Sequence, residues 1–213
     1  HDVEMAKTVL PKWVYNEKVD VFLQAQAADV IMERNKICGL AIAGKNGLEK
    51  ILGNIVVDAT GDGVVAYCAG AEYDKGRPGD KLMQPASLMF TLSGVDTERA
   101  VYCFGEVCST LVNGERFDEY CIKAHEEGRL PTNVSCVRLY PHVNEGEVLC
   151  NTTQANYIDG TKHEDIIKAE LILREQIGQV IDFLRKYVPG YENCTLKDSA
   201  DMLGVRETRR IIG

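Results

Sequence analysis

The stretch Ile55–Ala66 reads IVVDATGDGVVA, an apolar strand pattern that stops at a turn of small residues and continues into a short helix. Apolar residues run up to Val57, and glycines follow at positions 61 and 63. Glycine lets a backbone approach a ligand closely, and the amides at a helix start attract negative or electron-rich groups. The stretch therefore predicts a strand–turn–helix that lies against a bound ligand.

The spacing of Gly61, Gly63 and Ala66 also fits the GxGxxA form of the dinucleotide fingerprint. In a functional fingerprint the first glycine directly follows the last residue of the strand, because the pyrophosphate binds at the helix N-terminus. Here residues 58–60 intervene, and residues 73–85 have the composition of a loop where a second strand should follow. We therefore do not interpret this stretch as the fingerprint itself.

The composition describes an acidic globular protein. The 213 residues carry a net charge of -8, with 45% hydrophobic and 26% charged residues. An acidic chain does not suit the phosphates of nucleic acids or anionic membrane surfaces. The sequence has no apolar run of membrane-spanning length and no signal-peptide pattern. We therefore predict a cytoplasmic protein without nucleic-acid or membrane partners, and the oligomeric state stays open.

The eight cysteines are scattered among apolar neighbours, and none forms a CxxC pair. Without a targeting signal, buried reduced thiols are favoured over the disulfides of a secreted protein. A redox pair of Cys103 and Cys108 is the alternative to ordinary packing of these two residues. No two histidines have metal-ligand spacing, so we predict no metal site.

Patterns in the first part of the chain predict a helix followed by a small antiparallel sheet. Residues 3–15 have helical amphipathic spacing. Alternating segments follow at 19–23, 28–32 and 39–42, and Asn46-Gly47 is a strong hairpin signal. We predict a β-meander that leads into a strand over 51–57 and a short helix over 64–69.

Residues 73–85 are rich in Gly, Pro and charge, which predicts a loop connecting two domains. Beyond it we predict a strand at 87–92, helices at about 97–112 and 115–127, strands near 136–140 and 147–154, and a long helix at about 162–188. The long helix carries a continuous apolar stripe. Thr161 and Glu164 form a capping-box pattern at its start, and Pro189-Gly190 ends it.

The motif VDATGD at residues 57–62 resembles the ATG motif of FAD-dependent oxidoreductases with glutathione-reductase-like dinucleotide folds. In that family a β-meander precedes the motif, and its turn lies beside the bound flavin nucleotide. The stretch MQPASLMF at 83–90 also resembles the family, and YVPGY at 187–191 and LGVRETRRI at 203–211 are similar to landmarks of one subgroup. The resemblance covers nearly the whole chain with the motifs in the family's order.

The resemblance implies FAD as the cofactor and an α/β fold. Residues 1–75 would be the C-terminal part of a split FAD/NAD(P)-binding domain with its β-meander, and 76–213 an α+β substrate or cap domain. The cofactor-binding residues would be Ala59, Thr60, Gly61, Asp62, Gln84 and Pro85. Alternatively, Asp62 caps the following helix and Pro85 starts a strand.

Flavin chemistry also needs a cation near the reduced ring or on a substrate carboxylate, and Arg206 and Arg209 are the candidates. The alternative is a solvated basic run beside Glu207. His142, in a predicted loop, is the candidate acid or base.

The family's N-terminal GxGxxG and its closing C-terminal segment are absent, so we expect an internal fragment that does not hold FAD tightly alone. The function expected is part of a FAD-dependent oxidoreductase acting on a small molecule. The alternative is a cofactor-free substrate- or partner-binding module.

Overall fold

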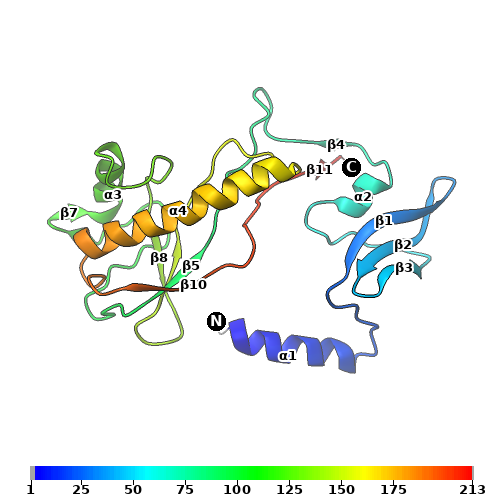
Figure 1. Ribbon diagram of the computed structural model, residues 1–213, viewed down its shortest axis with the longest axis horizontal. Coiled ribbons are helices and arrows are strands. Elements are labelled where there is room, and N and C mark those ends of the chain that lie inside the picture. Colours follow the sequence, from blue (N-terminus) through cyan, green and yellow to red (C-terminus); the bar gives the residue numbers. More distant parts are fainter. Residues whose placement is uncertain (1–2, 213) are drawn as a thin grey trace. The chain divides into compact units, whose positions relative to one another are not determined.

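The computed structural model describes residues 3–212 (Figure 1). The chain divides into two compact units. Unit 1 comprises the chain up to Lys75 together with the segment that begins at Arg209, and unit 2 is Gly76–Thr208. Small antiparallel sheets and helices make up both units, so the fold is of mixed α/β type. The assignment of the units as a split FAD domain and a substrate domain stays a prediction.

Unit 1 is built around an antiparallel meander with strand order β1-β2-β3 (Figure 1). The hairpin between the last two strands closes where Gly44 pairs with Gly47, which has a φ of 94°. Only glycine adopts such a φ without steric cost, which explains the Asn-Gly signal. The elements of unit 1 are α1 (Val3–Asn16), β1 (Gln26–Glu33), β2 (Lys36–Gly44), β3 (Gly47–Leu52), α2 (Val64–Cys68), β4 (Tyr73–Asp74) and β11 (Arg210–Ile211).

The predicted helix at 3–15 and the hairpin are confirmed, but two predicted strands of unit 1 are wrong. Residues 19–23 form no strand, and the strand predicted at 51–57 ends at Leu52. The side chains of Ile55 and Val57 are 86% and 83% exposed. An apolar run becomes a strand only where neighbouring strands satisfy its backbone groups, and no described strand pairs with residues 54–57.

Unit 2 is an antiparallel sheet of order β10-β5-β9-β8 with a long helix, α4, lying across it (Figure 1). The predicted apolar stripe on α4 is confirmed, because Leu173, Ile177 and Leu184 are buried in one cluster with Phe90 and Leu139 of the sheet. The elements of unit 2 are β5 (Phe90–Ser93), β6 (Leu111–Val112), β7 (Glu115–Arg116), α3 (Phe117–Glu126), β8 (Arg138–Pro141), β9 (Val148–Asn151), α4 (His163–Tyr187) and β10 (Thr195–Ser199).

The helix predicted at 97–112 is wrong, although the next predicted helix is present as α3. The segment instead runs through turns and pairs with the strand edge, where Cys103 and Leu139 exchange backbone hydrogen bonds of 3.0 and 2.9 Å. The apolar residues of this segment are nevertheless buried in the core, among them Val101, Cys103 and Cys108. They reach the core without forming a helix. Tertiary pairing overrode the local pattern here.

The capping box predicted at the start of α4 does not form. The Thr161 hydroxyl donates a hydrogen bond to Asp159 at 2.6 Å, and the Asp159 N–H donates to the Asp165 carboxylate at 2.9 Å. Asp165 lies in the first turn of α4, where a negative charge complements the helix dipole. The predicted end of the helix is confirmed, because Gly190 follows it with a φ of 87°.

We expect Ile177→Asp to unfold unit 2. The Ile177 side chain is 4% exposed on the inner face of α4, and burying an unpaired carboxylate there costs several kcal/mol. Leu171→Asp is the matched control on the same helix, since Leu171 is 67% exposed and its substitution should change stability by about 0.5 kcal/mol or less. Urea unfolding followed by circular dichroism separates the two, and equal stability losses would contradict the packing described.

Candidate functional site

The turn after Val57 is organised by one carboxylate. Asp58 accepts hydrogen bonds from the Thr60 N–H at 3.0 Å, from the Thr60 hydroxyl at 2.8 Å and from the Ala66 N–H at 2.9 Å. The Thr60 hydroxyl oxygen in turn accepts a bond from the Val64 N–H at 3.0 Å. These bonds satisfy donors at the start of α2, which would otherwise lack partners. The turn therefore has a fixed shape before any ligand arrives.

These bonds also set the ionisation of Asp58. Partial desolvation alone would raise its pKa, but the hydrogen bonds from Ala66 and Thr60 outweigh it and hold the pKa below the ordinary value of 3.8. Hydrogen bonds to the ionised form of a carboxylate favour that form. Asp58 is thus an ionised acceptor at neutral pH.

The turn leaves its outer edge open. Gly61 has a φ of 79°, and a Cβ built on it would meet nothing within 4 Å. Gly63 has a φ of 61°, and its Cβ would come within 3.0 Å of the Ile211 side chain. The predicted cofactor residues Ala59, Thr60 and Gly61 are exposed. The backbone of this turn is therefore accessible to a ligand on the Gly61 side and packed against the β11 segment on the other.

Arg209, one of the predicted catalytic cations, also belongs to unit 1. Its guanidinium carbon lies 4.1 Å from the centre of the Tyr67 ring and 5.9 Å from that of Tyr73. The two rings meet edge to face at 5.4 Å. The Arg209 Nε is buried and has no hydrogen-bond partner among the described residues. The aromatic faces thus hold this cation in place, and one of its donors stays unsatisfied.

The other two predicted catalytic residues belong to unit 2. Arg206 is exposed. His142 follows β8, and its Nδ1 lies 3.2 Å from a carboxylate oxygen of Glu147. Glu147 is also bound by Lys197 at 2.7 Å, which is the main reason that its pKa is lowered. His142 is therefore part of a surface charge cluster, and the catalytic roles of all three residues stay predictions.

Unit 2 contains a small cavity of about 230 Å³ at the predicted cofactor residue Pro85. Arg77, Asn156 and Tyr157 line it as well, and Arg77 forms an ion pair with Asp80 at 2.6 Å. Tyr157 has a φ of 61°, an unusual conformation for a tyrosine. The neighbouring Gln84 is exposed. The cofactor roles of Gln84 and Pro85 stay predictions.

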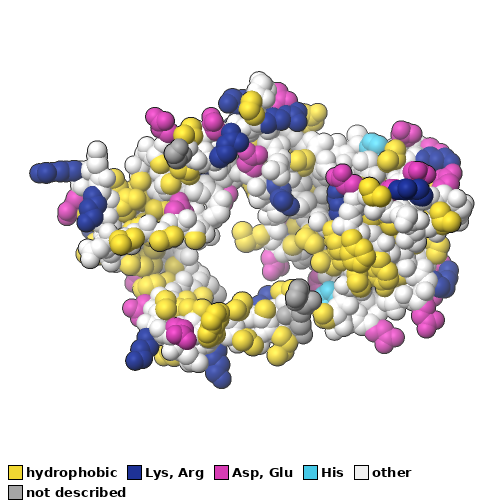
Figure 2. Space-filling model, turned by 180° about the vertical axis from the view of Figure 1, so that it is seen from behind, with side chains coloured by type: hydrophobic (Ala, Val, Ile, Leu, Met, Phe, Trp, Pro, Cys, Tyr) yellow, Lys and Arg dark blue, Asp and Glu magenta, His cyan; other side chains and the backbone are white. Residues whose placement is uncertain are grey.

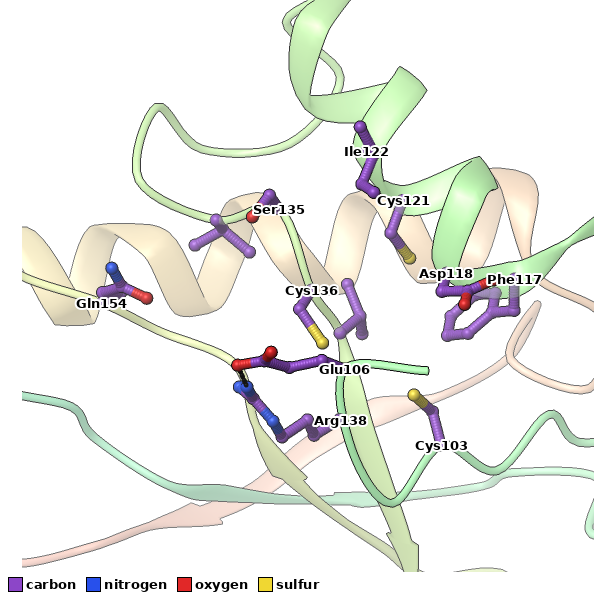
Figure 3. Close-up of a pocket in the computed structure, with 12 residues that line it drawn as sticks. Cys103, Glu106, Phe117, Asp118, Cys121, Ile122, Ser135, Cys136, Arg138 and Gln154 are labelled. Atoms are coloured by element: carbon purple, nitrogen blue, oxygen red, sulfur yellow. Dashed lines mark hydrogen bonds and ion pairs between the residues drawn. The ribbon is translucent and has the colours of Figure 1, made fainter. Parts of the chain in front are cut away.

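A second cavity in unit 2, of about 310 Å³, was not predicted (Figure 3). Three thiols line it, those of Cys103, Cys121 and Cys136. Arg138 and Glu106 form an ion pair of 3.3 Å at its edge. The thiols come from a turn, from α3 and from the segment before β8, so their spacing in the sequence gives no motif. The count of eight cysteines was the signal for such a cluster, and it did not specify which residues meet.

Comparison with known families identifies the chain. The sequence profile of the family described as FAD dependent oxidoreductase matches residues 1–213, and the chain belongs to this family. FAD is the cofactor of the family. No curated protein and no solved structure gives a significant match.

The residues present fit one part of a flavin site. The exposed Thr60–Gly61 backbone, which Asp58 holds in shape, offers the close approach that a nucleotide needs. The sequence contains no GxGxxG that directly follows a strand. Within residues 3–212, no group of three or more His, Cys, Asp or Glu side chains is arranged to hold a metal ion. None of the helices in this part of the chain is both long and apolar enough to span a bilayer.

We expect Asp58→Asn to lower the free energy of unfolding at pH 7 by about 1 kcal/mol, the usual worth of a capping interaction. Because the pKa of Asp58 is below 3.8 in the folded protein, its contribution is complete above that value and is lost as the pH falls through the folded pKa. The difference between the two proteins should therefore vanish in acid. Urea unfolding between pH 7 and pH 2 measures it, with exposed Asp20→Asn as the control.

Proposed function

We propose that this chain is part of an enzyme that oxidises or reduces a small molecule through FAD, with the Ala59–Asp62 turn beside the flavin nucleotide. The observation that carries the proposal is the family match along the whole chain, combined with a preformed and exposed turn at the motif. The bound flavin would supply the electron-transfer chemistry. The protein would position the flavin and the substrate and would place charged side chains near them.

The residues of unit 1 suggest how that charge is supplied. Arginine stays protonated at all physiological pH values, and Arg209 is held on the Tyr67 ring with an unsatisfied Nε donor. A fixed cation of this kind would stabilise the negative charge that a flavin gains on reduction. We therefore propose Arg209 as the electrostatic residue of the site, with Arg206 and His142 as substrate-side residues of unit 2.

The exposed apolar residues of unit 1 support a larger parent protein. Ile55 and Val57 are the apolar positions of a strand pattern, yet both are more than four-fifths exposed. Burying a side chain of this size contributes about 1.5–3 kcal/mol. We propose that additional strands and helices of the parent protein, including its GxGxxG, cover this segment and grip the FAD pyrophosphate.

The helix α1 favours the second candidate, a cofactor-free binding module. None of its side chains is buried, and Figure 2 shows apolar side chains exposed along it. Trp13, 61% exposed, is the type of residue that anchors protein interfaces. A binding module would use this face without any flavin, so flavin content separates the two proposals. For either one, the eight free cysteines support a reducing, cytoplasmic compartment.

The decisive experiment is an absorbance spectrum of the natural protein that contains this chain. The proposed enzyme should purify with, or take up, an oxidised flavin whose visible bands bleach on addition of dithionite. A folded protein that stays colourless after incubation with FAD would refute the proposal and favour the binding module.

In the same protein, Gly61→Val should weaken FAD binding by about tenfold or more, which corresponds to about 1.4 kcal/mol. The new side chain would enter the open space where we place the nucleotide. Gly70→Val is the matched control, because Gly70 also lies in unit 1, has a φ of 81° and faces open space. Both variants bear similar backbone strain, so equal losses of FAD affinity, measured by flavin fluorescence, would contradict the placement.

A further inference from the structure

Three of the eight cysteines, Cys103, Cys121 and Cys136, line the 310 Å³ cavity of unit 2. The Cys103 and Cys136 thiols donate to the same acceptor, the backbone oxygen of Gly105, at 3.2 and 3.3 Å. Both thiols line the cavity, whereas the Cys108 thiol donates to the backbone oxygen of Tyr102 at 3.4 Å. Figure 3 shows the sulfur atoms of Cys103 and Cys136 directed into the space between them.

The two thiols of this pair differ in their surroundings. Cys103 is 2% exposed, whereas Cys136 is half-buried on the segment before β8. The cavity opens to solvent beside the ion pair of Arg138 and Glu106, because the Glu106 side chain is 85% exposed. A small solute entering from that side would reach the Cys136 thiol first.

We propose that Cys103 and Cys136 form a redox-active dithiol that exchanges with small-molecule disulfides entering the 310 Å³ cavity. In the first step the Cys136 thiol loses its proton, and its sulfur attacks the disulfide. A mixed disulfide forms on Cys136, and one small thiol leaves with that proton. Cys103 then attacks the Cys136 sulfur and releases the second small thiol with its own proton. Two protein thiols are oxidised, and one small disulfide is reduced to two thiols.

The segment between Cys103 and Cys108 is suited to the rearrangement that a disulfide needs. A disulfide requires the two Cα atoms to lie within about 7 Å and a defined torsion. The side chains of Phe104 and Val107 are 67% and 75% exposed, and a Cβ on Gly105 would meet nothing within 4 Å. Few packing contacts therefore oppose movement of this segment toward Cys136.

The charge and burial of the two thiols determine the expected rate of disulfide exchange. Burial raises the pKa of Cys136, and nearby Arg138 partly offsets that rise. Burial raises the pKa of Cys103 to about 12. Only the thiolate attacks a disulfide, so exchange should be slow at neutral pH and accelerate about tenfold for each unit of pH below the pKa. A metal role for the cluster is disfavoured, since no group of three or more ligands in residues 3–212 has the arrangement to hold an ion.

Incubation of the folded protein with oxidised glutathione tests the proposal. Free thiols are alkylated after an acid quench, and the digested peptides are mapped by mass spectrometry. We expect a Cys103–Cys136 cross-link that forms faster as the pH rises and disappears on adding reduced glutathione. Recovery of both residues as alkylated free thiols, under conditions that modify Cys38 and Cys68 of unit 1, would overturn the proposal.

Single substitutions assign the roles. In Cys103→Ser the cross-link should be lost and a Cys136–glutathione mixed disulfide should accumulate, because the second thiol is missing. In Cys136→Ser both products should be lost. Cys108→Ser is the matched control, because Cys108 is buried on the same segment as Cys103, and this variant should keep the cross-link. Loss of the cross-link in Cys108→Ser, or a Cys103–Cys108 cross-link in the wild type, would contradict the assignment of Cys136.

The cross-linking experiment gives a clear answer even if a cysteine variant does not fold or the protein binds no flavin. The peptide map of the wild-type protein decides the pairing even if a cysteine variant fails to fold, and thermal melting identifies such a variant. The assay contains no flavin, and the proposal does not rest on the FAD function. Either can therefore fail without affecting the other.

Discussion

Every buried strand must find partners both for its backbone groups and for its apolar side chains, and the two units meet this constraint to different degrees. In unit 2 one cluster of buried residues joins the sheet and α4, with Phe90, Leu139 and Leu173 at most 1% exposed. In unit 1 the buried apolar side chains are few, among them Ile42 and Val65. The segment before Asp58 exposes Ile55 and Val57 to solvent, although it carries the pattern of a core strand.

This difference explains which parts of the fold could be predicted from the sequence. The α4 stripe and the Asn46-Gly47 hairpin depend on spacing and turn chemistry within a few residues, so local patterns identified both. The wrong predictions at 51–57 and 97–112 concern segments whose structure depends on a distant partner. At 97–112 the partner is the strand edge at Leu139, whose hydrogen bonds to Cys103 replace those of a helix. Within 51–57, Ile51 and Leu52 pair with β2, but no described strand pairs with residues 54–57.

The candidate site shows the same limit. The motif located the turn because its glycines and its strand-to-helix position are visible in sequence. It did not reveal that Asp58 reaches the Ala66 N–H across the turn, nor that Arg209 stacks on Tyr67. The second contact joins residues far apart in the chain, and the sequence offered no way to choose between Arg206 and Arg209. Placing Arg206 and Arg209 in different units follows from the fold alone.

The thiols of unit 2 illustrate why contact and burial must be weighed together. Cys150 and Cys194 are fully buried, and a thiol with no access to solvent behaves as a small apolar side chain. Burial raises the pKa of Cys136 as well, but this residue lines an open cavity beside Arg138. A raised pKa slows exchange without preventing it, whereas lack of access prevents it at any pH. Partial exposure at the cavity therefore separates Cys136 from the buried cysteines. Cys103 gains its role because its thiol donates to the same Gly105 oxygen as that of Cys136, rather than by its own exposure.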